Sequence, residues 1–299
     1  MDLTTPAAPT TVDVAQSVAN TPGYWSTVLS RLKRDKTTIF FGIVLVSIVL
    51  MAIFAPLVAP ADPYKANIVC RLKEIGYPGH LLGTDQTGRD MLSRLIYGGR
   101  LSLFMGVTPV AIALLIGGLL GVFAGYVGGK LNMAVMRIMD VFYAFPSVLL
   151  AIALSGALGG GINNAILSLT IVFIPPIARV GESVTTQVRS LDYVEAARAS
   201  GASSLRIVRV HVLSNVLGAV FVYATSLISV SIILASGLSF LGLGTKPPEP
   251  EWGLMLNELR QAIYVNPYVA ALPGVMIFMT SMSFNLLSDG LRSAMDLKT

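Results

Sequence analysis

The chain has 299 residues, of which 54% are hydrophobic and only 12% are charged, and its formal net charge is +5. Soluble domains carry roughly 25% charged residues, so this composition excludes an ordinary soluble protein and indicates membrane-spanning helices. The basic residues lie at the ends of apolar runs and form no stripe, which excludes a typical nucleic-acid-binding protein. The sequence therefore predicts an all-α protein embedded in a membrane.

The first span is predicted at 39–58. Residues 1–23 are rich in Thr, Ala and Pro, and a basic cluster follows at 31–36, so 1–36 is interpreted as a disordered tail and juxtamembrane segment. The apolar run is too long for the core of a signal peptide, and it ends at the proline-rich stretch "APLVAPADP". With the polar linker that follows, it forms a unit over 37–100.

Five more apolar runs predict five more spans, for a total of six. They lie at 101–127, 133–158, 163–180, 212–236 and 268–287. They form a predicted core over 101–290, followed by a tail at 291–299.

The distribution of Lys and Arg predicts that both termini are cytoplasmic. With that orientation, the inner segments hold 13 basic residues and the outer segments hold 8. The polar block 181–211 then lies inside, and the loops 59–100 and 237–267 lie outside.

No motif predicts catalysis or a metal centre. "AGYVGGKL" is the stretch nearest to a phosphate-binding loop, but Ala124 replaces the first glycine and Leu131 replaces the Ser/Thr. Cys70, His80 and His211 form no cluster at ligand spacing, so no metal site is expected. The chain is therefore predicted not to be an enzyme.

Ionisable and proline residues mark two spans. Asp140 lies three residues after Arg137, so the two can pair on one helix face, as a structural pair or as part of an ion relay. The pair Pro175-Pro176 is expected to break or kink the fourth span.

Small and hydroxyl residues recur at helical spacing in two other spans. Glycines recur every four residues and can pack against a helix of this chain or of a second membrane subunit: Gly117, Gly121, Gly125 and Gly129. Hydroxyls in the fifth span can line a polar pathway or join neighbouring helices: Thr225, Ser229 and Ser236.

The stretch "YVEAARASG" (193–201) predicts a short helix between the fourth and fifth spans. Asp192 can cap it, Glu195 can pair with Arg198, and Gly201 suits a left-handed stop. Ser203 or Ser204 can cap a second helix that leads into the fifth span. The first helix is either a docking element or a solvated connector.

"YVEAARASGASSLRIVRVHVLSN" resembles the EAA loop of bacterial ABC importer permeases. The stretches 80–103, 125–154, 238–256 and 284–296 are similar, in the same order, to the C-type permease of dipeptide, oligopeptide and nickel importers. The similarity covers residues 30–297. It implies a type I ABC importer permease fold in the bacterial inner membrane, with the EAA loop at 190–214.

The resemblance also implies partners and a docking site. The partners are a second, B-type permease, two ATPase subunits that bind ATP and Mg, and an extracytoplasmic substrate-binding protein; this chain binds no cofactor. The ATPase-docking residues carried over are Glu195, Ala196, Ala197 and Gly201, to which Asp192, Tyr193 and Arg198 are added by adjacency.

Two features leave alternatives open. The family motif closes with a Leu-Pro pair, whereas Leu213 is followed here by Ser214, which puts the rigidity of the entry to the fifth span in question. Short peptides are the expected cargo; nickel or other metal chelates, opines and oligosaccharides are the alternatives within the family. A self-contained channel or ion-coupled carrier is the alternative of another class.

Overall fold

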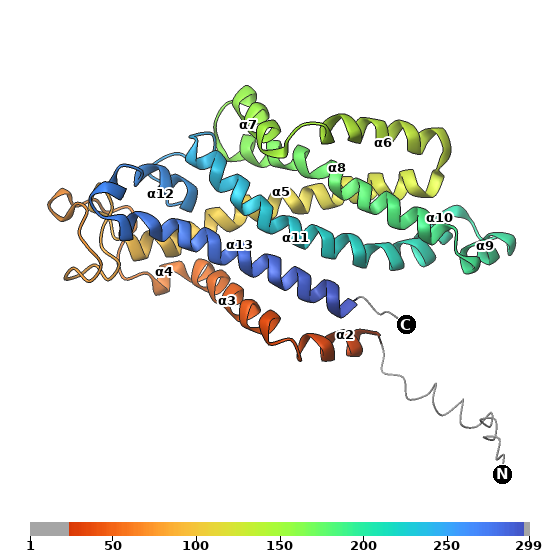
Figure 1. Ribbon diagram of the computed structural model, residues 1–299, viewed down its shortest axis with the longest axis horizontal. Coiled ribbons are helices and arrows are strands. Elements are labelled where there is room, and N and C mark those ends of the chain that lie inside the picture. The colour runs from red at the N-terminus through yellow and green to blue at the C-terminus, as the bar shows by residue number, and fades with distance from the viewer. Residues whose placement is uncertain (1–23, 296–299) are drawn as a thin grey trace, which may run out of the picture.

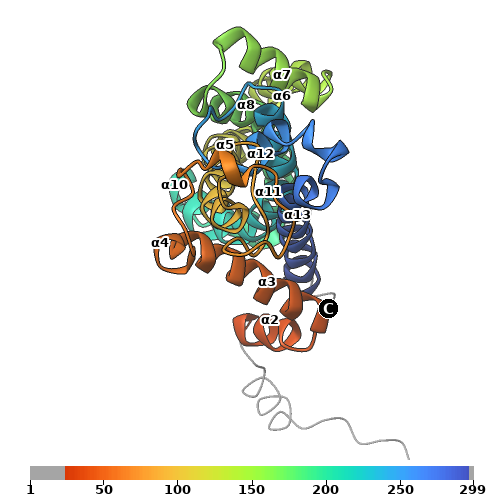
Figure 2. The same ribbon diagram turned by 90° about the vertical axis from the view of Figure 1, so that its left-hand side faces the viewer.

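The structure is a computed structural model that describes residues 24–295, and Figures 1 and 2 show it as an elongated helical bundle. The principal helices are α2 (Tyr24–Leu32), α3 (Lys36–Ile53), α4 (Ala55–Val58), α5 (Met91–Val127), α6 (Gly129–Tyr143), α7 (Ser147–Leu158), α8 (Ile162–Arg189), α9 (Asp192–Ala199), α10 (Ser204–Ile207), α11 (Leu213–Phe240), α12 (Trp252–Glu258) and α13 (Pro267–Met295). Short 3₁₀ turns lie at Ile68–Cys70 and Ala262–Tyr264, and a π turn lies at Val208–Val212. No strand occurs within 24–295.

Within residues 24–295, five helices are long and apolar enough to cross a membrane: α3, α5, α8, the continuous helix Ser204–Phe240 that contains α11, and α13. The pair α6 and α7 makes a sixth span only if both are counted together, because the two helices meet at 86°. The predicted third span, 133–158, is therefore wrong as a single straight helix. Pro146 has no N–H to donate and disfavours a helical Phe145, so the helix stops before it.

The proline pair in the fourth span does not break the helix. α8 runs through Pro175 and Pro176 without interruption, so the break expected from the sequence is wrong. Proline is tolerated inside membrane helices. Close packing on α5 accompanies this stretch of α8, since the Ile174 carbonyl lies against Gly117.

α5 begins ten residues before the predicted span. Its 37 residues extend about 55 Å at 1.5 Å per residue, longer than the ~30 Å hydrocarbon core of a bilayer. Asp90 caps its start by accepting a hydrogen bond from the Ser93 N–H at 2.8 Å. The first turns of α5 therefore belong to the layer of loops at one end of the bundle.

The ends of the bundle differ in what they contain. α2 and the end of α13 lie toward the end that carries α9, and α4, α12 and the loop after α4 lie toward the opposite end (Figure 1). Of the predicted tail 1–36, residues 1–23 lie outside the described part, whereas 24–32 form helix α2. In the predicted tail 291–299, residues 291–295 continue α13, and 296–299 lie outside the described part.

α5 and α8 make the most extensive helix pairing, and glycines let their backbones approach. A Cβ added at Gly117 or Gly125 would lie 2.7 Å from a carbonyl oxygen of α8, and one added at Gly121 would overlap the Ala178 carbonyl. The fourth glycine of the predicted stripe, Gly129, does not take part. It follows the bend at Gly128, begins α6, and has no atom within 4 Å of its Cβ position.

We predict that Gly121→Ala destabilises the protein by about 1–3 kcal/mol, because the new methyl group overpacks the contact between α5 and α8. Thermal unfolding of the detergent-purified protein measures this loss. Gly118→Ala is the matched control on the same helix, since its Cβ would contact only side-chain atoms at 3.9 Å. Equal melting temperatures for the two variants would contradict the assignment.

Candidate functional site

α9 is a short, well-defined helix at the end of the bundle where α8 stops (Figure 1). Leu191 occupies the N-cap position, so the predicted cap by Asp192 is wrong: Asp192 lies in the first helical turn and its side chain makes no cap bond. Asp192 and Glu195 place negative charge near the N-terminus and Arg198 places positive charge in the last turn. In both positions the charge interacts favourably with the helix dipole.

A glycine stop ends α9. Gly201 has φ +82°, and the N–H groups of Gly201 and Ala202 donate to the carbonyls of Arg198 and Ala197, each at 3.1 Å. This pair of bonds is the Schellman motif, which requires a left-handed residue. Ser203 then caps the next helix by accepting from the Arg206 N–H. The glycine stop and the serine cap thus end one helix and begin the next within four residues.

One face of α9 is buried and the rest is exposed. Val194 is fully buried and Ala197 packs beside it in the main hydrophobic core. The side chains of Asp192, Glu195, Ala196 and Arg198 are exposed. Within the described part of the chain, Glu195 and Arg198 do not form the ion pair predicted from their spacing. Their charges are therefore available on the outer face.

Tyr193 ties α9 to the beginning of α11. Its hydroxyl accepts a hydrogen bond from Asn215 at 3.2 Å, and its ring lies 6.0 Å from that of His211. The Asn215 amide also donates to the His211 carbonyl at 2.7 Å. Asn215 directly follows Ser214, which stands where a proline was expected from the resemblance. The Asn215 side chain fastens this segment to α9.

The helix that enters the fifth span is continuous although it lacks the expected proline. Ser204–Phe240 is one helix, with a π turn at Val208–Val212, and Ser214 donates to the Val210 carbonyl at 2.8 Å. π turns within helices are frequent at functional sites. The segment that follows the turn after α9 therefore leads into α11 without a break.

A second link joins the end of α8, just before α9, to α5. Arg189, at the end of α8, donates to the carbonyls of Gly125 and Tyr126 at 3.3 and 2.9 Å. These carbonyls lie in the last turn of α5, where a cation also favours the helix dipole. The ends of α5 and α8 are thus fastened directly before α9 begins.

Two residues predicted as possible pathway residues contact α13 from α11, Thr225 through its hydroxyl and Ser229 through its backbone carbonyl. Thr225 is 3.0 Å from the Ser288 hydroxyl, and the Ser229 carbonyl accepts from Ser281 at 3.1 Å. Ser236 is buried beside Gly253, where a Cβ would meet its backbone. All three residues serve contacts within this chain.

Asp140 has a different partner from the one predicted. Arg179 of α8, 39 residues away in the sequence, donates to its carboxylate, so the predicted pair with Arg137 is wrong. Arg137 and Asp140 share α6, but the close packing of α6 on α8 brings Arg179 nearer. Sequence spacing alone could not show this contact.

The opposite end carries a buried cluster of four charges. Arg89 and Arg94 both contact Asp85 and Glu258, with N–O distances from 2.5 to 3.4 Å. Burial alone would raise the pKa of Asp85, but hydrogen bonding and the charges of the two arginines outweigh it and hold that pKa below its usual value. The cluster joins the loop 59–90, α5 and α12.

Glu251 and Trp252 join the loop before α12 to α5. Glu251 accepts from Ser102 at 2.9 Å and from the N–H groups of Gly253 and Leu254, while the Trp252 ring donates to the Leu95 carbonyl at 2.9 Å. Burial is the main influence on Glu251 and raises the pKa of its carboxyl, against these hydrogen bonds. The loops at this end of the bundle are thus held against α5 by several buried contacts.

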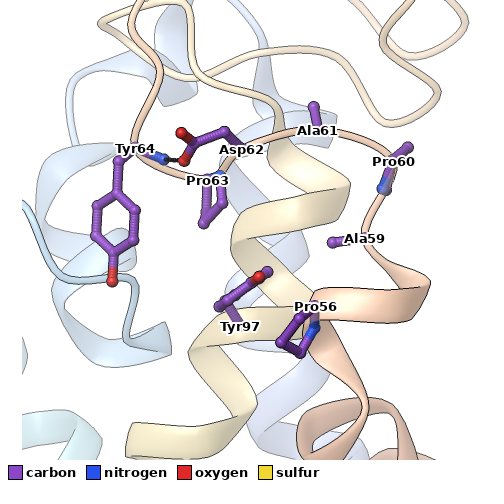
Figure 3. A pocket seen from close by; sticks show the side chains of 8 residues that line it. All are labelled: Pro56, Ala59, Pro60, Ala61, Asp62, Pro63, Tyr64 and Tyr97. Carbon is purple, nitrogen blue, oxygen red and sulfur yellow. Dashed lines mark hydrogen bonds between the residues drawn. The ribbon is translucent and has the colours of Figure 1, made fainter.

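A groove of about 490 Å³ opens at this end between the proline-rich arm and α5 (Figure 3). It is lined by Pro56, residues 59–64 and Tyr97. The Tyr64 N–H bonds to the Asp62 carboxylate at 2.9 Å, and its hydroxyl donates to Glu249 at 2.8 Å. The arm is therefore fastened to the loop before α12.

Comparison with known proteins identifies the family. Residues 117–299 match the family described as binding-protein-dependent transport system inner membrane component, and residues 23–72 match the N-terminal transmembrane domain of oligopeptide transport permease C. The chain belongs to the binding-protein-dependent transport system permeases. It is a multi-pass protein of the inner membrane.

Curated relatives of this permease align over nearly its whole length. The glutathione transport system permease protein GsiD of Pectobacterium atrosepticum is 39% identical over 92% of this chain and 91% of its own length. The dipeptide transport system permease protein DppC of Alkalihalophilus pseudofirmus is 40% identical over 92% of this chain and 90% of its own. The di/tripeptide permease DppC of Pseudomonas aeruginosa is 43% identical over 84% of each.

A solved structure supports the fold. A chain of the inward-facing MetNI methionine ABC transporter superposes with a TM-score of 0.57 at 23% identity and covers 68% of this permease and 97% of itself. At this identity the similarity shows the fold alone. The predicted type I permease fold is thereby confirmed.

Sequence reasoning missed several residues that hold the permease together. Asn215 anchors α9, Arg179 pairs with Asp140, and Arg94 joins Asp85 to Glu258. A charged residue inside an apolar span, three residues after the proline pair, was a readable signal for Arg179. The other two contacts depend on tertiary packing.

We predict that Gly201→Val destabilises α9 by about 1 kcal/mol, which lowers the protection of its amides from hydrogen exchange about fivefold. The cause is backbone strain at positive φ and not a clash, because open space surrounds the Cβ position of Gly201. Hydrogen exchange of the α9 amides measures this effect. Gly201→Asn is the matched control, since Asn tolerates the left-handed region better. Equal losses in both variants would show that φ is not the cause.

We also predict that the layer of loops joined by the Asp85 cluster loses stability in acid. A carboxyl whose folded pKa is lowered stabilises the fold above its unfolded value, and this contribution is lost as pH falls through the folded pKa. The melting temperature of the protein should therefore fall more steeply below about pH 4 than that of Asp85→Asn. Asp62→Asn, in the same loop but exposed, should keep the wild-type profile.

Proposed function

We propose that this chain is the non-catalytic membrane subunit of an ATP-driven importer of short peptides. The observation that carries the proposal is α9: a capped helix with one buried and one exposed face, positioned between two membrane helices. An exposed, rigid helix at that place can receive force from a partner and pass it to α8 and α11. The names of the dipeptide and di/tripeptide relatives support peptides as cargo.

The assembly that follows has a second, B-type permease beside this one, two ATPase subunits below α9, and an extracytoplasmic binding protein on the loops around α12. ATP and Mg bind to the ATPases and not to this chain. α2 and the end of α13 lie toward the same end as α9, which supports cytoplasmic termini. The docking residues are Asp192, Tyr193, Glu195, Ala196, Ala197, Arg198 and Gly201.

Within this set the structure supports two roles. Glu195, Ala196 and Arg198 are exposed and can touch the ATPase. Ala197, Gly201 and the hydroxyl of Tyr193 shape and fasten the helix. The first group should therefore affect affinity for the ATPase directly, and the second should act through the position of α9.

We predict that Glu195→Lys lowers co-purification of the ATPase subunits at least about tenfold, or about 1.4 kcal/mol, because it reverses the charge on the exposed face of α9. Pull-down of the complex from detergent measures this loss. The control is Lys65→Glu, an exposed charge reversal at the opposite end. If Glu195→Lys retains both the ATPases and ATP-driven peptide uptake, the docking assignment is wrong.

The same preparation tests the alternative classes. Peptide uptake into vesicles that contain this permease but no ATPase subunit would favour a self-contained channel or carrier. Uptake of nickel chelates, opines or oligosaccharides in place of peptides by the complete complex would keep the architecture and change the cargo.

A further inference from the structure

We propose that the face at the bend between α6 and α7 is a contact site for a zwitterionic short peptide, formed by the Asp140–Arg179 pair and an adjoining aromatic pocket. This inference rests on the proposed function, which names peptides as cargo without saying where they touch this chain. Three independent features of the face carry it: its pocket, its charges and its backbone.

The pocket has a volume of about 240 Å³ and lies where α6, α7, α8 and α11 meet. Its aromatic lining is Phe142, Tyr143, Phe145, Phe173 and Tyr223. Sites for whole small molecules are about 300–1,000 Å³. This pocket therefore fits one side chain of a peptide, and the remainder of the site falls to the facing permease.

The charges lie beside the pocket. Arg179 donates to Asp140, and its guanidinium lies 5.5 Å from the centre of the Tyr143 ring. Arg179 is 17 residues after Ile162, which places it about 25 Å along α8 and away from both ends of that helix. An ionisable pair inside a span faces a bundle interior or a watery cavity, and not lipid.

Both charges are open to a ligand. The Arg179 and Asp140 side chains are 50% and 38% exposed. An apolar helix packed over them would bury an ion pair at a desolvation cost that its own side chains could not offset. A peptide with free termini brings one carboxylate and one ammonium group, so each member of the pair gains a partner and no charge is left alone.

The backbone around the pocket also suits a polar ligand. The chain is not helical between Tyr143 and Ser147, and irregular backbone inside a membrane is tolerated where it lines a watery cavity or is covered by protein. On the facing helix, Pro175 and Pro176 have no N–H to donate to the carbonyls of Ile171 and Val172. Val172 and Pro176 both line the pocket, so a carbonyl that has lost its usual donor belongs to a lining residue.

The test uses the complete complex in vesicles, with the binding protein and a labelled dipeptide that contains phenylalanine. Arg179→Gln and Asp140→Asn should lower uptake at least tenfold while the ATPases stay bound and the binding protein keeps its affinity for the dipeptide. Arg179→Lys should recover part of the loss, because it keeps the charge but not the planar fork. Arg137→Gln, an exposed arginine one turn away on α6, should match wild type.

A cross-linking arm covers the case in which these variants fail to assemble. A photoreactive phenylalanine azide in place of Tyr143 should capture the labelled dipeptide during turnover, whereas the same group at Leu115, an exposed position on α5, should not. Cross-links from position 143 only to the second permease would overturn the proposal, as would wild-type uptake by both charge variants. A wild-type complex that takes up no dipeptide would instead overturn the proposed function.

Discussion

The close approach of the α5 and α8 backbones positions the functional surfaces of this permease. Gly117, Gly121 and Gly125 recur every four residues, and the α8 residues whose carbonyls they meet, Ile174, Ala178 and Glu182, recur with the same spacing. Because the glycines of α5 and the carbonyls of α8 recur with the same spacing, they match at every turn of the contact. This match fixes the register between the two helices. α8 ends where α9 begins and also carries Arg179, and both features therefore depend on this contact.

The two ends of the molecule are rigid for different reasons. At the α9 end, local backbone rules make the helix and its stop. Asn215 fastens α9 to α11, and Arg189 fastens the end of α8 to α5. At the opposite end, paired buried charges and the Trp252 ring hold the loops against α5 and α12. The irregular segment at 144–146 lies between them, in the α6–α7 arm on the edge of the bundle (Figure 2).

Sequence reasoning succeeded where the cause was local. The short helix, the left-handed Gly201 and the cap by Ser203 follow from neighbouring residues, and the structure confirms them. It failed where the deciding contact was distant: Asp140 finds Arg179 across two helices. The prolines show both cases. Packing against α5 keeps α8 continuous through Pro175 and Pro176, whereas Pro146 lies among exposed residues and ends its helix.

That contrast explains why a pocket forms at this place. A proline that interrupts a helix and a proline pair that does not are brought together, because Pro175 and Pro176 line the same pocket as Phe145. The bend turns aromatic rings toward α8, and the prolines leave carbonyls of α8 without their usual donors. α8 lines this pocket, is held to α5 and is followed after two residues by α9. The same helix thus connects the surface proposed to bind the ATPase with the surface proposed to bind the peptide.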